Sequence, residues 1–257
     1  MRDVFWLSEE QLARIEPFFL KAHGVPRVDD LKVISGIIFV IKNGLRWRDA
    51  PSEYGPHKTL YNRFIRWSRL GVFDNIFSHL TAQDGPPDTL MIDATHPGSA
   101  PHGLQPAKKG DVPRRIGRTK GGLNSKLHAI VDGHWLRVMG RPVIMCLREG
   151  QTSDHIGARI LYPAIPDGAK TLIGDKSYDS NEYRTALRAR GITPDVPPRK
   201  GRKSPAGYCK TLYRQRHKVE NMCARLKDWR RIATRYDRCA HTFLSAILIA
   251  AIVIYWI

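Results

Sequence analysis

The sequence predicts an α/β fold, in which a mixed sheet flanked by helices is preceded by a small all-helical domain. Residues 1–80 carry apolar side chains at helical spacing, whereas residues 89–174 contain short apolar runs between helical segments and loops. Such runs alternating with helical patterns are typical of an α/β sheet. A linker at 82–88, rich in Gly, Pro and Asp, separates the two patterns. We therefore expect a helical domain at 1–82 and a sheet domain at 83–257.

The N-terminal region contains three predicted helices. The first begins after Ser8, because Gln11 three residues later completes a capping box. The second covers residues 31–42 and is closed by Asn43-Gly44. The third covers residues 59–70 and is basic on the faces away from its apolar stripe.

A helix, a turn and a basic amphipathic helix are what a helix-turn-helix DNA reader needs. We therefore predict that residues 1–82 bind DNA, and the alternative is a small helical domain with a solvated basic face. Trp67 lies on the apolar stripe and is assigned to the core. The candidate DNA contacts are Lys58, just before the third helix, and Asn62, Arg63 and Arg66 on the polar faces of that helix.

The second region contains four predicted strands, at 89–95, 127–131, 142–147 and 171–174. Helical segments are expected near 154–162 and 181–190, and basic loops at 97–122 and 197–207. The last 15 residues, Phe243–Ile257, are almost entirely apolar. A membrane-spanning helix needs about 20 such residues, so we predict a buried core helix.

Charge is the strongest global property of the chain. The formal net charge is +18 and the isoelectric point is about 10.1, with 30 of the 42 basic residues in 86–257. This charge favours a phosphate polyanion as partner over an acidic membrane. The four cysteines are widely spaced and the N-terminus has no signal-peptide pattern, so we expect reduced thiols in a cytoplasmic protein.

The segment Tyr213–Lys227 is the most informative part of the chain. Tyr213, Arg216, Glu220 and Lys227 fall on one face of a continuous helix, because each residue turns about 100°. A neighbouring apolar stripe, which would bury the helix against a core, is formed by Leu212, Val219, Cys223 and Leu226. A single acid on a basic face suits a metal ion beside a polyanion.

Two further acids directly follow the apolar runs of predicted strands: Asp93 follows LMI and Asp175 follows LIG. Ligands gather at the carboxyl ends of strands in open α/β sheets, so both could share one site with Glu220. Three hard oxygen ligands suit Mg²⁺ or Mn²⁺, and two such ions would stabilise phosphoryl displacement. Taken alone, an acid in such a position more often caps a turn or the next helix than takes part in catalysis, so the prediction depends on the three acids together.

These motifs resemble the DDE transposases of bacterial insertion sequences, in the insertion-sequence-four and -five superfamily. The Y-x2-R-x3-E-x6-K signature is complete, and MIDATH and GDKSYDS match the motifs of the first two acids. Ser177 stands where the family usually has glycine. The segments GRTKGGLNSKLHAIVD, EGQTSD and RRIATRYDR also match the group, and the opening region resembles the five branch.

The resemblance implies a ribonuclease H-like catalytic domain. Two Mg²⁺ or Mn²⁺ ions would be held by Asp93, Asp175 and Glu220. Water activated by the metal would cut double-stranded DNA at the transposon ends, and the freed 3′-OH would then attack target DNA. Arg216 and Lys227 would grip phosphates, with Tyr213 beside them. The protein would act as a homodimer or larger complex on nucleoid DNA.

Other residues are weaker candidates for DNA contact. Trp47 and Trp229 could stack on bases. His96 is assigned to a satisfied strand end, and His217 to a neighbour of phosphate or base at best. The remaining candidates are basic residues, namely Lys120, Lys176, Arg230 and Arg231.

Three other functions remain open from the residues. The chain could be a catalytically silent, sequence-specific DNA-binding protein derived from a transposase. It could also be an unrelated metal nuclease or resolvase on the same fold, or a basic structural protein. The last explains the charge but not the spacing of the acids.

Overall fold

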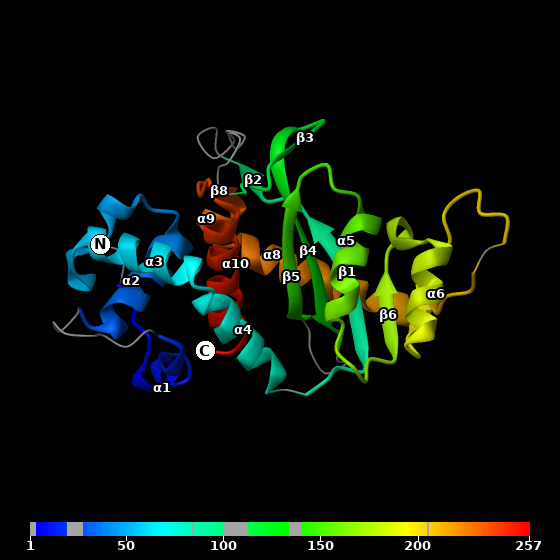
Figure 1. Cartoon of the computed structure of the whole chain (residues 1–257), viewed down its shortest axis with the longest axis horizontal. Helices are drawn as coiled ribbons and strands as arrows, with labels where there is room; N and C mark the ends of the chain where they lie inside the picture. The colour runs from blue at the N-terminus through cyan, green and yellow to red at the C-terminus, as the bar shows by residue number, and fades with distance from the viewer. Residues whose placement is uncertain (1–3, 20–27, 84, 100–112, 134–139, 205) are drawn as a thin grey trace. The chain divides into compact units, whose positions relative to one another are not determined.

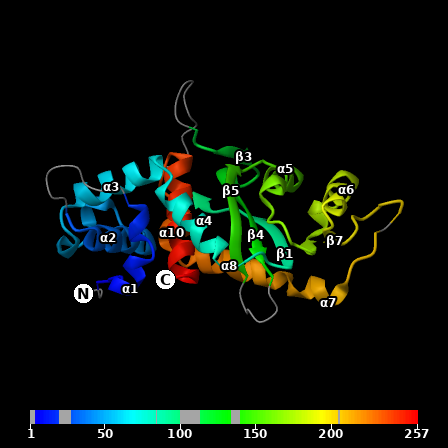
Figure 2. The same ribbon diagram turned by 60° about the horizontal axis from the view of Figure 1, so that its bottom comes forward.

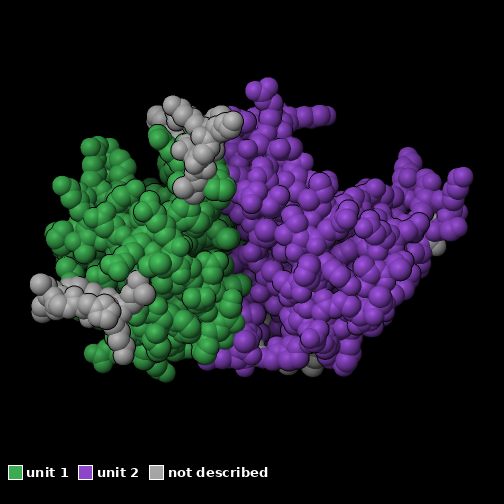
Figure 3. All heavy atoms as spheres, in the orientation of Figure 1, with its two compact units in different colours: residues 1–80, 98–114, 226–257 green, residues 81–97, 115–225 purple. Residues whose placement is uncertain are grey.

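The computed structural model describes residues 4–19, 28–83, 85–99, 113–133, 140–204 and 206–257. Figure 1 shows the order of the elements along the chain. The chain forms two compact units, coloured separately in Figure 3. The first, the helical unit, comprises Met1–Leu80, Gly98–Arg114 and Leu226–Ile257, and the second, the sheet unit, comprises Thr81–Pro97 and Arg115–Arg225.

The helical unit begins with the predicted capped turn. Ser8 accepts a hydrogen bond from the Gln11 amide and the Gln11 side chain accepts one from Ser8, which starts α1 (Glu9–Ala13). The element is short, because a 3-10 turn containing Pro17 follows. The next helices are α2 (Asp30–Asn43), α3 (His57–Arg69) and α4 (Val72–Ala82). Gly44 closes α2 in the left-handed conformation, as its Asn-Gly signal predicts.

The C-terminal helix α10 (Ala240–Tyr255) is buried over most of its length, which confirms the predicted core helix. The Trp256 ring meets Phe77 with centroids 5.6 Å apart, and the Arg14 guanidinium donates to the Trp256 carbonyl. The sequence placed this helix with residues 83–257, but its contacts place it with the N-terminal helices. Among the described residues, every helix is too short or too polar to cross a membrane.

The sheet unit is built on a mixed sheet, which confirms the predicted fold class. The four predicted strands are β1 (Thr89–Thr95), β4 (Gly122–Asp132), β5 (Arg141–Glu149) and β6 (Thr171–Gly174). The strand order is β3-β4-β1-β6-β7, with β5 pairing the other edge of β4. Strand β1 runs antiparallel to β4 and parallel to β6. Three-residue strands, too short to give a sequence pattern, complete it as β3 (Gly117–Thr119) and β7 (Thr193–Asp195).

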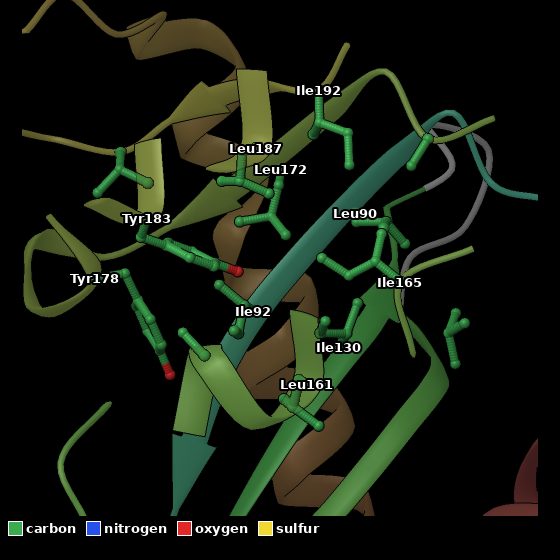
Figure 4. Close-up of a cluster of buried hydrophobic side chains, with 14 residues drawn as sticks. Leu90, Ile92, Ile130, Leu161, Ile165, Leu172, Tyr178, Tyr183, Leu187 and Ile192 are labelled. Carbon is green, nitrogen blue, oxygen red and sulfur yellow. The ribbon is translucent and has the colours of Figure 1, made fainter. Parts of the chain in front are cut away.

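Helices cover both faces of the sheet (Figure 2). One face carries α5 (Asp154–Leu161) and α6 (Asn181–Ala189), close to the predicted positions. The opposite face carries α7 (Lys210–Tyr213) and α8 (His217–Lys227). The core under α5 and α6 is shown in Figure 4 and includes Leu90, Ile92, Ile130, Leu161, Leu172 and Leu187.

The predicted basic loop at 97–122 is only partly a loop. Residues 100–112 lie outside the described residues. The described ends form β2 (Gly98–Ser99), which pairs with β8 (Thr234–Arg235), and β3, which pairs with the start of β4. The second loop, 197–207, has no helix or strand in its described part.

Candidate active site

Asp93 lies in the middle of the sheet. It follows the buried residues Leu90–Ile92 of β1, and its Oδ1 accepts a hydrogen bond from the Ala94 amide (2.8 Å). Burial raises the pKa of Asp93, and the charge of Asp175 adds to this rise. The Ala94 amide and the Arg216 guanidinium oppose the rise without cancelling it. A carboxylate that is costly to ionise gains when a cation lies beside it.

Asp175 directly follows β6, the strand that pairs with β1, at a position level with Asp93. Strands β1 and β6 are parallel, and their last paired residues are Ile92 and Gly174. Asp93 and Asp175 therefore each follow the same register pair, at the carboxyl end of β6. The sequence predicted two acids on neighbouring strands near the carboxyl end of the sheet; Asp175 directly follows β6, whereas Asp93 lies within β1, two residues before its end.

The Asp175 side chain caps the turn that follows it. Its Oδ1 accepts hydrogen bonds from the Ser177 amide (2.7 Å) and the Ser177 hydroxyl, which begins the 3-10 helix η6 (Lys176–Tyr178). Ser177 does not have a positive φ, so the turn does not need the usual glycine here. The serine adds a hydroxyl donor to the second acid.

Glu220 joins this group through Arg216. The Arg216 Nη1 donates to Asp93 Oδ2 (3.0 Å) and its Nη2 donates to Glu220 Oε1. Asp93 and Glu220 together raise the pKa of Arg216, outweighing the burial that alone would lower it. Arg216 thus forms one ion-paired cluster with Asp93, which is 123 positions away in the sequence, and with Glu220, which is 4 positions away. Arg216, predicted to grip phosphate, instead bridges two of the three acids.

The helix that carries Arg216 and Glu220 is broken, which corrects the predicted continuous helix at 213–227. Helix α7 ends at Tyr213, a 3-10 turn covers Arg214–Arg216, and α8 begins at His217. A 3-10 turn advances about 120° per residue instead of 100°, so the predicted face does not extend through it. Val219 and Cys223 are nevertheless buried, as the predicted stripe requires.

The donor set fits a hard divalent cation by its chemistry, since all three side chains offer carboxylate oxygens. Its present geometry does not form a complete metal site. Within the described ranges, His, Cys, Asp and Glu side chains nowhere gather in threes at metal-binding positions. The Arg216 guanidinium supplies the positive charge between Asp93 and Glu220.

The structure corrects three predicted DNA contacts. Trp229 is 4% exposed, so its ring is not available for stacking on bases. Arg231 is buried and paired with Asp237 through two hydrogen bonds (2.9 and 3.0 Å). Arg63 is largely buried and paired with Asp30 (2.6 Å). Each of these side chains holds the helical unit together, so none presents a free surface to DNA.

The other predicted contacts remain accessible in whole or in part. Tyr213 is half-buried, with its ring edge-on to Tyr208 (5.6 Å between centroids). Lys227 is half-buried at the end of α8. The exposed residues are Lys58, Asn62, Arg66, Lys120, Lys176 and Arg230.

The histidine and tryptophan assignments have mixed outcomes. His96 Nε2 contacts the Gly150 carbonyl (3.1 Å), and Trp67 is fully buried, as predicted. His217 contacts the Arg214 carbonyl (2.8 Å). Trp47 packs near Tyr61 and Phe64 and lies under the Arg231 guanidinium (5.2 Å).

One polar cluster near the sheet was missed from the sequence. His128 on β4 is fully buried, and neither ring nitrogen has a hydrogen-bond partner among the described residues. On the same strand, Lys126 forms an ion pair with Asp154 (2.7 Å). The only signal was a histidine within the apolar run LHAIV.

We expect His128 to make the free energy of unfolding depend on pH. Burial lowers the pKa of His128 to about 4, from a usual value near 6.5. Below pH 6.5 the unfolded chain binds a proton that the folded chain does not. The free energy of unfolding should therefore fall between pH 6.5 and 4, by about 3 kcal/mol from this residue. Urea titrations at several pH values should show a smaller fall in His128→Leu, and an equal fall would contradict this account.

Two family models match the chain. One, described as "Putative transposase of IS4/5 family (DUF4096)", matches residues 7–77, and the other, "Transposase DDE domain", matches residues 172–256. The second range contains Asp175 and Glu220, and Asp93 lies outside both.

Several relatives share parts of the sequence. An uncharacterised protein of Sinorhizobium fredii, y4sN, is 31% identical over 113 residues, covering 42% of this chain and 90% of that protein. The "Putative transposase for insertion sequence element IS402" of Burkholderia cepacia is 28% identical, covering 56% of this chain and 72% of that protein. Among solved structures, the piggyBac transposase synaptic complex with hairpin DNA gives a TM-score of 0.51 at 10% identity, covering 97% of this chain and 72% of that chain. This last similarity concerns the fold alone.

Proposed function

Because the chain belongs to the DDE transposases of bacterial insertion sequences, in the IS4/5 superfamily, its function is DNA transposition, and we propose that Asp93, Asp175 and Glu220 carry its DNA cleavage chemistry. The cleaved substrate is the terminal inverted repeat of the element, and the freed 3′-OH then attacks target DNA. The pairing of β1 with β6, together with the Arg216 bridge, carries this proposal. The strand pairing puts Asp93 and Asp175 after paired residues of neighbouring strands, and Arg216 links Asp93 to Glu220.

Asp93, Asp175 and Glu220 would hold Mg²⁺ or Mn²⁺, and two ions are expected. When bound, such ions activate water or a 3′-OH and stabilise the attacking and leaving oxygens of the phosphoryl group. Glu220 must exchange its bond to Arg216 for this role. The freed guanidinium can then donate to a phosphate, where a preorganised cation stabilises the anionic transition state.

We propose that accessible basic residues within each unit also contact DNA. We expect the protein to bring two transposon ends together as a homodimer or larger complex. A cluster in which Arg216 already neutralises two acids also suits the alternative, a catalytically silent DNA-binding protein. Cleavage assays separate the two.

We expect purified protein to cut DNA carrying the terminal repeats only when Mg²⁺ or Mn²⁺ is present. Cleavage should stop in EDTA, because the three acids would lose the cation that stabilises the transition state. Sequencing-gel analysis of end-labelled DNA should place the cut at the repeat boundary and show a 3′-OH. Binding without such a cut in either metal would favour the silent alternative.

A further inference from the structure

A buried carboxylate, Asp179, lies four residues after Asp175 and is bound by three arginines. Its Oδ1 accepts hydrogen bonds from Arg184 Nε (2.8 Å) and Arg202 Nη1 (2.6 Å), and its Oδ2 accepts one from the Arg199 backbone amide (2.9 Å). The Asp179 and Arg184 side chains are 1% and 2% exposed. Burial alone would raise the pKa of Asp179, but these hydrogen bonds outweigh it and hold the pKa below its usual range.

The same arginines fix the chain after β7. The Arg184 guanidinium also donates to the carbonyls of Pro194 (3.5 Å) and Val196. Arg202 donates to Asn181 Oδ1 and to the Ser204 carbonyl (3.0 Å). The residues before and after position 199 are therefore tied to the start of α6.

The Arg199 side chain contacts the turn that follows Asp175. Its Nε donates to the Lys176 carbonyl (3.2 Å), its Nη2 donates to the Ser177 carbonyl (2.8 Å), and it contacts the His155 ring. Lys176 and Ser177 belong to η6, whose capping residue is Asp175. Residues Arg199–Lys203, here called the 199–203 segment, are thus held beside the Asp175 turn.

The 199–203 segment presents unneutralised charge. Arg199, Lys200, Arg202 and Lys203 occupy four of its five positions, and Asp179 is already shared with Arg184. Lys200 and Lys203 are exposed and make no hydrogen bond or ion pair with the described part of the chain. A solvated loop would not need anchoring by a buried carboxylate, whose desolvation is costly. Fixed, closely spaced cations instead suit a polyanion.

We propose that the 199–203 segment binds the phosphate backbone of the DNA strand being cut, through Lys200 and Lys203. Asp179 is the positioning residue that holds the segment beside Asp175. This inference rests on the proposed function, because the strand is the substrate of the three acids. It adds a DNA-contact site that lies outside the Y-x2-R-x3-E-x6-K signature.

The salt dependence of DNA binding tests the contact. The logarithm of the DNA association constant falls linearly with the logarithm of the salt concentration, and each phosphate contact adds about 0.9 to the steepness of this fall. The double variant Lys200→Gln/Lys203→Gln should therefore make the slope shallower by about 2. The matched control, Lys170→Gln/Arg188→Gln, removes the same charge from exposed positions of the same unit and should leave the slope nearly unchanged. Equal slopes in the two double variants would overturn the contact.

Limited trypsin digestion tests the positioning role. Asp179→Asn should release the 199–203 segment, so that trypsin cleaves after the arginines and lysines of this segment at least about tenfold faster. The salt dependence of DNA binding should become shallower, as in the Lys200→Gln/Lys203→Gln variant. Should Asp179→Asn not fold, Arg202→Gln removes one anchor only and should still give faster cleavage after the remaining basic residues of the segment. Unchanged digestion in a folded variant would overturn the role of Asp179. If Glu220→Gln still cuts DNA, the proposed function is wrong. If Glu220→Gln does not cut DNA but the two double variants show the same salt dependence of DNA binding, only the proposed role of the 199–203 segment is wrong.

Discussion

Replacing Glu220 with glutamine is expected to reduce DNA cleavage by at least about a thousandfold, or about 4 kcal/mol of transition-state stabilisation. The amide keeps the size of the side chain but cannot supply a carboxylate to a cation. DNA binding and stability should change little, because the Glu220 side chain is 54% exposed. Single-turnover cleavage of an end-labelled terminal repeat measures the effect.

The matched control for this variant is Glu182→Gln, on the exposed surface of α6 in the same unit. It removes one carboxylate from an ion pair with Arg159 at 3.5 Å, which is a surface interaction worth little. Its cleavage rate should match that of the wild type. Equal rates in Glu220→Gln and Glu182→Gln would show that Glu220 has no catalytic role.

Arg184→Met is expected to destabilise the protein by about 3–5 kcal/mol. Methionine fills much of the same space, but it leaves Asp179 with fewer donors in a site that is almost fully buried. Breaking a buried ion pair by removing one partner usually costs this much. The free energy of unfolding from urea titration provides the measurement.

The control is Arg188→Met, on the exposed part of the same helix. An exposed substitution of this kind changes stability by about 0.5 kcal/mol or less. A similarly small effect in Arg184→Met would contradict the view that Asp179 depends on its arginine partners. A large effect would show how firmly the segment after β7 is held.

Elements with strong local signals could be predicted from the sequence. The capping box at Ser8 and Gln11 and the Asn-Gly stop after α2 are local features, and the structure confirms both. The apolar runs of β1 and β6 also match, because fully buried strands need continuous apolar side chains. Strands of three residues gave no pattern and were missed.

Predictions that depend on tertiary contacts were less successful. The break between α7 and α8 has no proline or glycine to mark it, so the spacing suggested one continuous helix. Trp229 and Arg231 lie among basic residues in the sequence, and only the fold shows that they are buried. Composition cannot distinguish a cation that faces DNA from one that pairs with Asp237.

The candidate site was partly predictable for a related reason. The positions of Asp93 and Asp175 directly after apolar runs indicated both acids, and the register of β1 and β6 places each of them after the same residue pair, Ile92 and Gly174. The bridge from Arg216 to Asp93 joins residues 123 positions apart, so no local pattern reveals it. Asp179 was missed because its partners are spread over the segment from Arg184 to Arg202.

Counting the Mn²⁺ ions bound to the complex with transposon-end DNA tests the central claim most directly, because it does not depend on turnover. Electron paramagnetic resonance of a Mn²⁺ titration should show two ions per active site in the wild type and in Glu182→Gln. Asp93→Asn, Asp175→Asn and Glu220→Gln should each bind fewer ions or bind them more weakly. Unchanged binding in all three variants would contradict the claim that these acids form one metal-binding site.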